Sequence, residues 1–227
     1  MSNSNIDQPI DLRDGDQLNI EKLTNFLKTN MNGIAEPLEI RQFPGGFSNL
    51  TYAIQSGEHD LVMRRPPYGA NIKSAHDMLR EYRVLSLLEP YYEKIPQPVL
   101  YCEDEEVIGA PFYVMERVKG LILRNKPPKG VDLSPAVMQA LSKAAIANLA
   151  KLHQIDLVES GLGELGKPEG YIQRQVTGWI KRYKKAQTDD IPAMDQLGTW
   201  LEAQQPKEDR AAFIHNDYKY DNLVLNP

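Results

Sequence analysis

The sequence predicts an α+β fold in two lobes. Its first half alternates apolar and polar residues in short runs separated by turns, as antiparallel strands do. From Leu121 onward the apolar residues instead recur at helical spacing. We therefore expect residues 1–116 to form an N-terminal lobe with an antiparallel sheet plus a helix, and residues 117–227 to form a mostly helical C-terminal lobe.

Length and composition limit the classes of protein. The 227 residues, 41% of them hydrophobic, can bury a sizeable core. The net charge of −5 argues against a general nucleic-acid binder or a protein held on an anionic membrane. Cys102 is the single cysteine, so no intrachain disulfide framework is expected, and residues 1–5 do not resemble a signal peptide. We expect a soluble cytoplasmic protein with no nucleic-acid or membrane partner.

A short helix is expected near the N-terminus, with Asp16 as its cap. Four apolar residues lie on one side of it: Leu18, Leu23, Phe26 and Leu27. This helix should pack as a cover on the sheet that follows.

Three antiparallel strands are expected at residues 38–43, 50–54 and 60–64. The turn between the first two contains four residues suited to a phosphate: Gly45, Gly46, Ser48 and Asn49. Glycine lets backbone N–H groups approach a phosphate closely, and Ser48 adds a hydroxyl donor. An ordinary hairpin turn explains the same residues.

The third strand ends in a cation, Arg64, which can bind phosphate or carboxylate through two hydrogen bonds. Arg65 should point to the opposite face of the strand, because successive side chains alternate. The order of two strands, a glycine-rich link and a third strand ending in a cation is that of a kinase nucleotide-binding lobe.

The next helix should begin at Ser74, with Asp77 completing a pair that resembles a capping box, and end near Glu89. It places Glu81 on or beside its apolar stripe, where a carboxylate needs a partner. Arg64 can be that partner. The alternative is that Glu81 lies at the edge of the stripe and pairs with Arg80, Arg83 or water.

Two further strands are expected at residues 99–102 and 110–116, separated by an acidic turn at residues 103–106. Residues 117–120 should form a turn and a hinge between the lobes.

Three helices should follow the hinge. The first has Ser134 as N-cap and Pro135 as its first residue, and we interpret His153 at its end as packed near the core, with bracing of a loop as the alternative. The others are expected at about residues 172–183 and 193–203. Four cations near the end of the second either complement the helix dipole or contact an anionic substrate: Lys181, Arg182, Lys184 and Lys185.

A polar loop near the end of the chain lies between two apolar runs, residues 211–214 and 223–225, which predict a loop between strands at a sheet edge. His215, Asp217 and Asn222 have the spacing of a kinase catalytic loop, in which Asp receives or orients the substrate hydroxyl proton and Asn holds Mg²⁺. The structural alternative is a loop whose Asp and Asn accept from local backbone N–H groups.

Taken together, these segments resemble the aminoglycoside phosphotransferase-like small-molecule kinases. The likeness is closer to the branch that includes the kinase-like domains joined to acyl-CoA dehydrogenases in animals, and it extends from Gln42 to Pro227. The segments that carry it are residues 45–52, 61–67, 80–85, 152–153, 170–175 and 214–222.

The resemblance implies a protein-kinase-like bilobal fold, ATP and Mg²⁺ as cofactors, and transfer of the γ-phosphoryl group to a hydroxyl of a small molecule, with hydroxyacyl-CoA thioesters among the acceptors. Asp217 would be the catalytic base and Asn222 the Mg²⁺ ligand. Arg64 would bind the phosphates and Glu81 would orient it. The remaining nucleotide contacts would come from the glycine turn and, by position at the hinge, from two further residues: Gly45, Gly46, Ser48, Asn49, Glu116 and Val118.

The chain departs from the family pattern in two places. Asn216 stands where the family usually has Gly. The family also has an Asp that binds Mg²⁺ a few positions beyond Pro227, and much of the acceptor site lies beyond that point, so we expect an incomplete C-terminal lobe. The alternative function is a non-catalytic, pseudokinase-like module that holds a nucleotide or a partner protein.

Overall fold

The computed structural model describes most of the chain: residues 8–13, 18–44, 49–67, 69, 77–124, 130–206 and 210–226. The chain divides into two compact units. The first comprises Met1–Ala150 with His215–Pro227, and the second comprises Lys151–Ile214. The lobe boundary expected after Glu116 stays a prediction.

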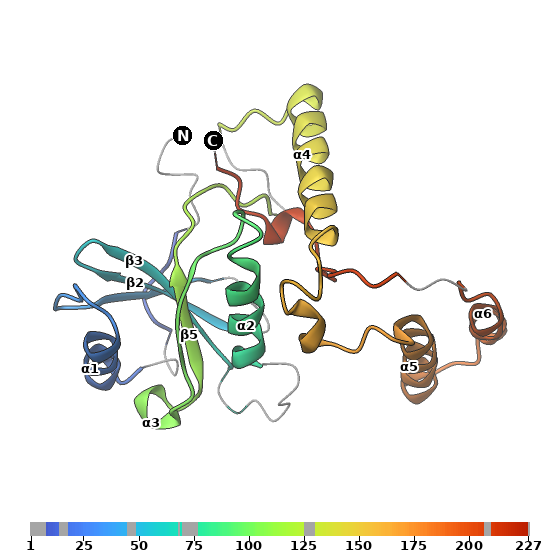
Figure 1. Cartoon of the computed structure of the whole chain (residues 1–227), viewed down its shortest axis with the longest axis horizontal. Coiled ribbons are helices and arrows are strands. Elements are labelled where there is room, and N and C mark those ends of the chain that lie inside the picture. Colours follow the sequence, from blue (N-terminus) through green and yellow to red (C-terminus); the bar gives the residue numbers. More distant parts are fainter. Residues whose placement is uncertain are drawn as a thin grey trace. The chain divides into compact units, whose positions relative to one another are not determined.

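A five-stranded antiparallel sheet forms the centre of the first unit (Figure 1). The strand order is β1-β2-β3-β5-β4, and every neighbouring pair is antiparallel. The five strands predicted before residue 117 are confirmed, and the α+β class with them. Their bounds are β1 Glu39–Gln42, β2 Leu50–Ser56, β3 His59–Arg65, β4 Pro98–Cys102 and β5 Phe112–Glu116.

One face of the sheet carries the main apolar core and is covered by α1 (Ile20–Asn30). Leu23 and Leu27 of α1 are fully buried there, and Phe26 packs edge-on against Phe112 with 5.5 Å between ring centroids. The predicted role of this helix as a cover is confirmed. Burial of the apolar stripe is what holds so short a helix in place, since an isolated helix of this length is marginal in water.

The opposite face of the sheet is covered by α2 (Met78–Leu88) (Figure 1). Tyr82 of α2 packs against two tyrosines of this face, with ring centroids 6.0 Å from Tyr101 and 6.4 Å from Tyr113. The strand alternation therefore separates two layers, and the side chains of β4 and β5 on the Tyr113 face lie on the side of α2 rather than of α1.

Arg64 and Arg65 illustrate this alternation. Arg65 is 1% exposed and donates from Nη1 to the carbonyl of Ile108, 3.0 Å away, in the short helix α3 (Glu105–Ile108). Arg64 lies on the α2 face. The prediction that the two side chains point to opposite faces is confirmed, and Arg65 is a structural residue because its guanidinium binds main-chain carbonyls.

Helix starts are where the prediction was least accurate. Asn19, not Asp16, caps α1, by accepting from the N–H of Lys22 at 3.0 Å; Asp16 lies outside the described residues. The second helix begins at Met78 with Asp77 as its N-cap, and Ser74 lies outside the described residues. The acidic segment at residues 103–106 was predicted as a turn, but it leads into α3, because Asp104 accepts from the N–H of Glu106 and starts a helical turn.

The helices after the hinge are confirmed. α4 spans Pro135–His153 and extends from the first unit into the second, which also contains a 3₁₀ turn at Leu162–Leu165. α5 (Tyr171–Ala186) and α6 (Pro192–Ala203) pack against each other. His153 is exposed, so its predicted packing near the core is wrong; Leu152 is the buried residue at that end of α4.

The two strands predicted around the polar loop are not formed. Residues 211–214 are irregular, and of the apolar run at residues 223–225 a single residue, Leu225, forms an isolated antiparallel bridge with Leu121. A strand needs a hydrogen-bonding partner along its length, and within the described residues these runs have no such neighbour. The prediction of a loop at a sheet edge is therefore wrong. None of the helices that the structure describes combines the length and the hydropathy that a bilayer-spanning segment requires.

Candidate active site

Arg64 and Glu81 form an ion pair between β3 and α2. Arg64 Nη1 lies 3.3 Å from Glu81 Oε2, and the two side chains are 32% and 31% exposed. Arg80 and Arg83, the alternative partners of Glu81, make no ion pair with it in the described part of the chain. The pair is half-buried, so solvent screens it less than a surface pair.

Two more donors hold the Glu81 carboxylate. Asn49 donates from Nδ2 to Oε1 at 2.8 Å, and the Tyr113 hydroxyl donates to Oε2 at 2.9 Å. Arg64 and Tyr113 are directly paired across β3 and β5, which explains why both reach the same carboxylate oxygen. Sequence reasoning missed Tyr113, because this pairing depends on β3 lying beside β5, and those strands are far apart in the chain.

Burial raises the pKa of Tyr113 well above its usual value. The carboxylate of Glu81 raises it further, and the Arg64 guanidinium opposes the shift. Tyr113 therefore keeps its proton throughout the physiological range and remains a hydrogen-bond donor to Glu81.

Arg64 is only partly satisfied by these contacts. Its Nε atom is buried and has no hydrogen-bond partner among the described residues. About a third of the side chain is exposed. A guanidinium with unused donors and a fixed position can accept an anionic ligand such as a phosphate.

The predicted glycine turn lies mostly outside the described residues. This applies to Gly45, Gly46 and Ser48, so their contact with a nucleotide stays a prediction. Asn49 is described and is 5% exposed, with its side chain directed to Glu81.

The hinge segment is held against β3. The main-chain carbonyl of Asp60 accepts a hydrogen bond from the backbone N–H of Arg117 at 2.9 Å. The carboxylate of Asp60 pairs with Arg117 Nη1 at 3.6 Å and with Lys119 Nζ at 2.6 Å. Glu116 and Val118 are exposed. The backbone of Val118 makes no hydrogen bond within the described ranges, so it is open to a ligand.

A small pocket of about 270 Å³ lies beside this hinge. The end of α2 and the segment before β4 form one side of it, and residues 116–118 form the other. Three carboxylates border it: Glu89, Glu93 and Glu116. It is unsuited to a polyphosphate, because the acidic lining would repel the charge.

The loop at residues 215–222 brings Asp217 and Asn222 together. Asn222 donates from Nδ2 both to the Asp217 carbonyl and to its Oδ2, each at 2.9 Å. Lys219 Nζ lies 3.3 Å from Asp217 Oδ1. Asn216 has a φ of +63°, a left-handed conformation that Gly adopts freely and Asn tolerates better than most residues. Asn216 therefore adopts the same left-handed backbone conformation that a Gly at this position could adopt.

The carboxyl group of Asp217 is exposed, and its pKa lies below the usual value. The hydrogen bond from Asn222 is the largest cause, followed by Lys219. Asp217 is therefore ionised at neutral pH and can accept a proton.

Two tyrosines anchor this loop on α4. The Tyr218 hydroxyl donates to the carbonyl of Ala145 at 3.0 Å, and the Tyr220 hydroxyl lies 3.0 Å from the Ser142 hydroxyl. The ring of His215 packs edge-on against Tyr218, with 5.5 Å between centroids. These contacts, rather than flanking strands, position the loop.

Gly120 makes the Leu121–Leu225 bridge possible. The two leucines exchange both main-chain hydrogen bonds, at 2.7 and 2.8 Å. A Cβ on Gly120 would lie 2.5 Å from the Leu225 carbonyl oxygen and 2.7 Å from a Val224 methyl carbon. No side chain fits at this position without moving the main chain of residues 224–225.

We expect Gly120→Ala to lower the free energy of unfolding by about 1–3 kcal/mol, as overpacking does, and to speed amide hydrogen exchange at Leu121 and Leu225. Urea denaturation and exchange mass spectrometry measure the two effects. Gly178→Ala is the matched control, because a Cβ there meets nothing within 4 Å and Gly is unfavourable inside a helix. Equal stability of the Gly120→Ala protein and the parent would contradict the packing argument.

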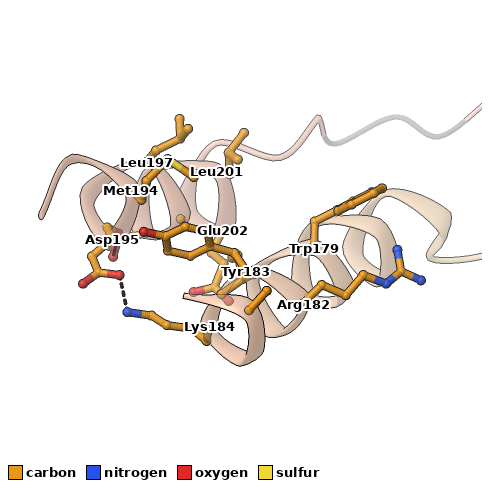
Figure 2. A pocket seen from close by; sticks show the side chains of 13 residues that line it. Trp179, Arg182, Tyr183, Lys184, Met194, Asp195, Leu197, Leu201 and Glu202 are labelled. Atoms are coloured by element: carbon orange, nitrogen blue, oxygen red, sulfur yellow. Dashed lines mark hydrogen bonds and ion pairs between the residues drawn. The ribbon is translucent and has the colours of Figure 1, made fainter. Parts of the chain in front are cut away.

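The larger pocket, of about 680 Å³, lies between α5 and α6 in the second unit (Figure 2). Its lining is mainly apolar, and Tyr183 lies between the two helices. Two of the cations singled out in the sequence have partners here. Lys184 pairs with Asp195, and Arg182 lies over the Trp179 ring at 4.8 Å. These contacts give Lys184 and Arg182 partners within the protein, so an anionic substrate is not needed to explain the presence of these two cations.

No metal cluster is evident in the part of the chain that the structure describes, since no three His, Cys, Asp or Glu side chains lie close enough to hold an ion. Asn222 uses its amide nitrogen for Asp217, which leaves its Oδ1 oxygen to accept a ligand. An amide oxygen beside a carboxylate suits a hard cation such as Mg²⁺, with phosphate oxygens and water supplying the remaining ligands.

Comparisons with known proteins show the family to which the chain belongs. The chain is 38% identical to mouse acyl-CoA dehydrogenase family member 10 over 205 residues, covering 90% of the chain and 19% of the relative. It is 38% identical to human acyl-CoA dehydrogenase family member 11 over 212 residues, covering 91% of the chain and 27% of the relative. The chain therefore spans about a fifth to a quarter of the length of these curated relatives.

Solved structures show the same fold. A Ralstonia eutropha protein classed with the aminoglycoside phosphotransferases has a TM-score of 0.80 and 36% identity, with 93% of this chain and 61% of that chain covered. Spectinomycin phosphotransferase, solved with ADP and spectinomycin, has a TM-score of 0.57 at 13% identity, with 91% and 65% covered, and shows the fold alone. The family model described as "Phosphotransferase enzyme family" matches residues 39–227. The chain belongs to the phosphotransferase enzyme family and has its protein-kinase-like fold.

Proposed function

We propose that this chain carries the ATP-binding and catalytic-loop residues of a kinase that transfers the γ-phosphoryl group of ATP to a hydroxyl group of a small molecule. The observation that carries the proposal is the Arg64–Glu81 ion pair, held by Asn49 and Tyr113 at the end of β3. A cation fixed by a carboxylate at this point of the sheet is what phosphoryl transfer requires for positioning the phosphates.

Arg64 is assigned to the nucleotide phosphates and Glu81 to the orientation of Arg64. Gly45, Gly46 and Ser48 would cover the phosphates from the turn before β2. Glu116 and Val118 would lie beside the base, with the open backbone of Val118 as its hydrogen-bonding group.

Asp217 is assigned as the catalytic base. The hydroxyl oxygen of the acceptor forms a bond to the γ-phosphorus while the bond from that phosphorus to its bridging oxygen breaks and releases ADP. Asp217 takes the hydroxyl proton as this occurs. Asp217 is ionised at neutral pH, so its carboxylate has a lone pair that can accept that proton. Mg²⁺, when bound at Asn222, would neutralise charge on the phosphates.

The acceptor is proposed to be a hydroxyacyl-CoA thioester. The support is that relatives named acyl-CoA dehydrogenase family members contain a region 38% identical to this chain. We also propose a cytoplasmic location, with which the unpaired and buried Cys102 agrees.

Thermal shift with ATP and Mg²⁺, followed by a transfer assay with radiolabelled ATP and a panel of hydroxyacyl-CoA thioesters, tests the proposal. Stabilisation by ATP together with a labelled acceptor supports it. Stabilisation without transfer favours the non-catalytic, nucleotide-binding alternative. A protein that does not respond to ATP contradicts both functions.

Lys219 offers a separate test of Asp217. Because Lys219 lowers the pKa of the Asp217 carboxyl, Lys219→Met should raise that pKa and move the acidic limb of the kcat profile to higher pH. The shift should be partial, since the larger contribution comes from Asn222, which the substitution leaves in place. Carbon NMR titration of the Asp217 carboxyl measures the pKa without relying on turnover. Lys181→Met, on the exposed surface of α5, should leave it unchanged.

A further inference from the structure

Asn49 has a position that the proposed nucleotide contact does not explain. It directly precedes β2 and ends the glycine turn, yet its side chain is directed into the protein, 5% exposed, with Nδ2 on Glu81 Oε1. A buried amide whose N–H group is given to a carboxylate is not arranged to meet a nucleotide in solvent.

The Glu81 carboxylate is divided between its partners. Asn49 occupies Oε1, whereas Tyr113 and Arg64 share Oε2. These three contacts come from three places in the sheet: Asn49 from the residue before β2, Arg64 from β3 and Tyr113 from β5. A carboxylate held on both oxygens cannot rotate about its last bond, so the position available to the Arg64 guanidinium is fixed as well.

We propose that Asn49 and Tyr113 are positioning residues that lock Glu81, and through it Arg64, so that each of them is coupled energetically to Glu81 in ATP binding. The inference rests on the proposed function, because it assigns Arg64 to the phosphates. Asn49 thus acts through Glu81 and not by touching the nucleotide.

A double-mutant cycle on ATP binding tests this coupling. Asn49→Ala should raise the Kd for ATP about tenfold, the loss expected for one hydrogen bond to a charged group, and leave the Kd for adenosine unchanged. In a Glu81→Ala background, Asn49→Ala should have no further effect on the Kd for ATP. Asn49→Asp should be worse than Asn49→Ala in the parent protein, because it sets a second carboxylate beside Glu81.

Tyr113→Phe provides a variant that keeps the shape of the core. It removes one hydroxyl and should also raise the Kd for ATP, again with no further effect once Glu81 is Ala. Tyr101→Phe is its matched control. Tyr101 is paired with Tyr113 across β4 and β5 and packs on the same Tyr82 ring, but its hydroxyl has no hydrogen-bond partner in the described part of the chain. It should bind ATP as the parent does.

The outcomes separate the inference from the proposed function. Equal losses in both backgrounds, or equal losses for ATP and adenosine, overturn the positioning role and leave the proposed function standing. Coupled losses in ATP affinity without phosphoryl transfer support the positioning role and contradict the kinase activity. A parent protein that binds ATP no better than adenosine removes the assignment of Arg64 and overturns both.

Discussion

Asp217→Asn is expected to lower kcat for phosphoryl transfer by about 10²–10⁴-fold, the contribution of a positioned general base. The amide cannot accept the hydroxyl proton at neutral pH. It can still accept the hydrogen bond from Asn222, so the loop should keep its conformation. ATP affinity should therefore stay close to that of the parent, because the loss lies in the chemical step. Steady-state kinetics with ATP and a phosphorylated acceptor, together with calorimetric ATP titration, measure the two quantities.

Asp221→Asn is the control for this substitution. Asp221 lies in the same loop, within the 3₁₀ turn at Tyr220–Asn222, and is exposed. Removing its charge should leave kcat near that of the parent. Turnover retained by Asp217→Asn would end the assignment of the base, and equal losses in both variants would indicate a general charge effect of the loop.

Arg64→Met is expected to reduce kcat/KM for ATP by about 10²–10³-fold, the range for removing one preorganised donor from a developing charge. The substitution removes the cation but keeps much of the aliphatic stem. Glu81 retains two donors, Asn49 and Tyr113, so the helix should remain docked on the sheet. Part of the loss should appear in the Kd for ATP, as measured by calorimetry, and the rest in kcat, while the Kd for adenosine stays unchanged.

Arg64→Lys should fall between the parent and Arg64→Met. Lysine keeps the charge but cannot bind phosphate and carboxylate through a planar pair of donors. Arg41→Met is the matched control, since Arg41 is an exposed cation on β1. An Arg64→Met protein with the ATP affinity of the parent would show that the phosphates bind elsewhere.

The sheet was predictable because the apolar residues within each strand indicate which of its side chains are buried. β2 and β3 each have a central run of apolar, buried residues, around Ile54 in β2 and around Met63 in β3, and such short apolar runs between turns are visible in the sequence. The alternation of side chains along a strand separated Arg64 from Arg65. Helix starts were less predictable, since Asn19 and Asp16, or Asp77 and Ser74, are chemically equivalent caps and the choice depends on packing.

The structure around the polar loop at residues 215–222 was not predictable from the sequence. Its apolar flanks predicted strands, but an apolar run forms a strand only where another strand accepts its hydrogen bonds, and here Leu121 pairs with Leu225 alone among the described residues. The loop is instead held by side chains, through Tyr218 and Tyr220 on α4. Nothing in their spacing indicates which helix they would reach.

By itself the sequence determined which chemistry is present: a cation at the end of a strand, a carboxylate on the next helix, and an Asp and an Asn at fixed spacing near the end of the chain. Those features are local, because periodicity and spacing place them on their elements. Only the tertiary structure decided which of these side chains contact one another. Glu81 binds Arg64, Asn49 and Tyr113 because β3 lies between β2 and β5 in the sheet. The strand order is set by packing of the whole sheet and not by any one segment.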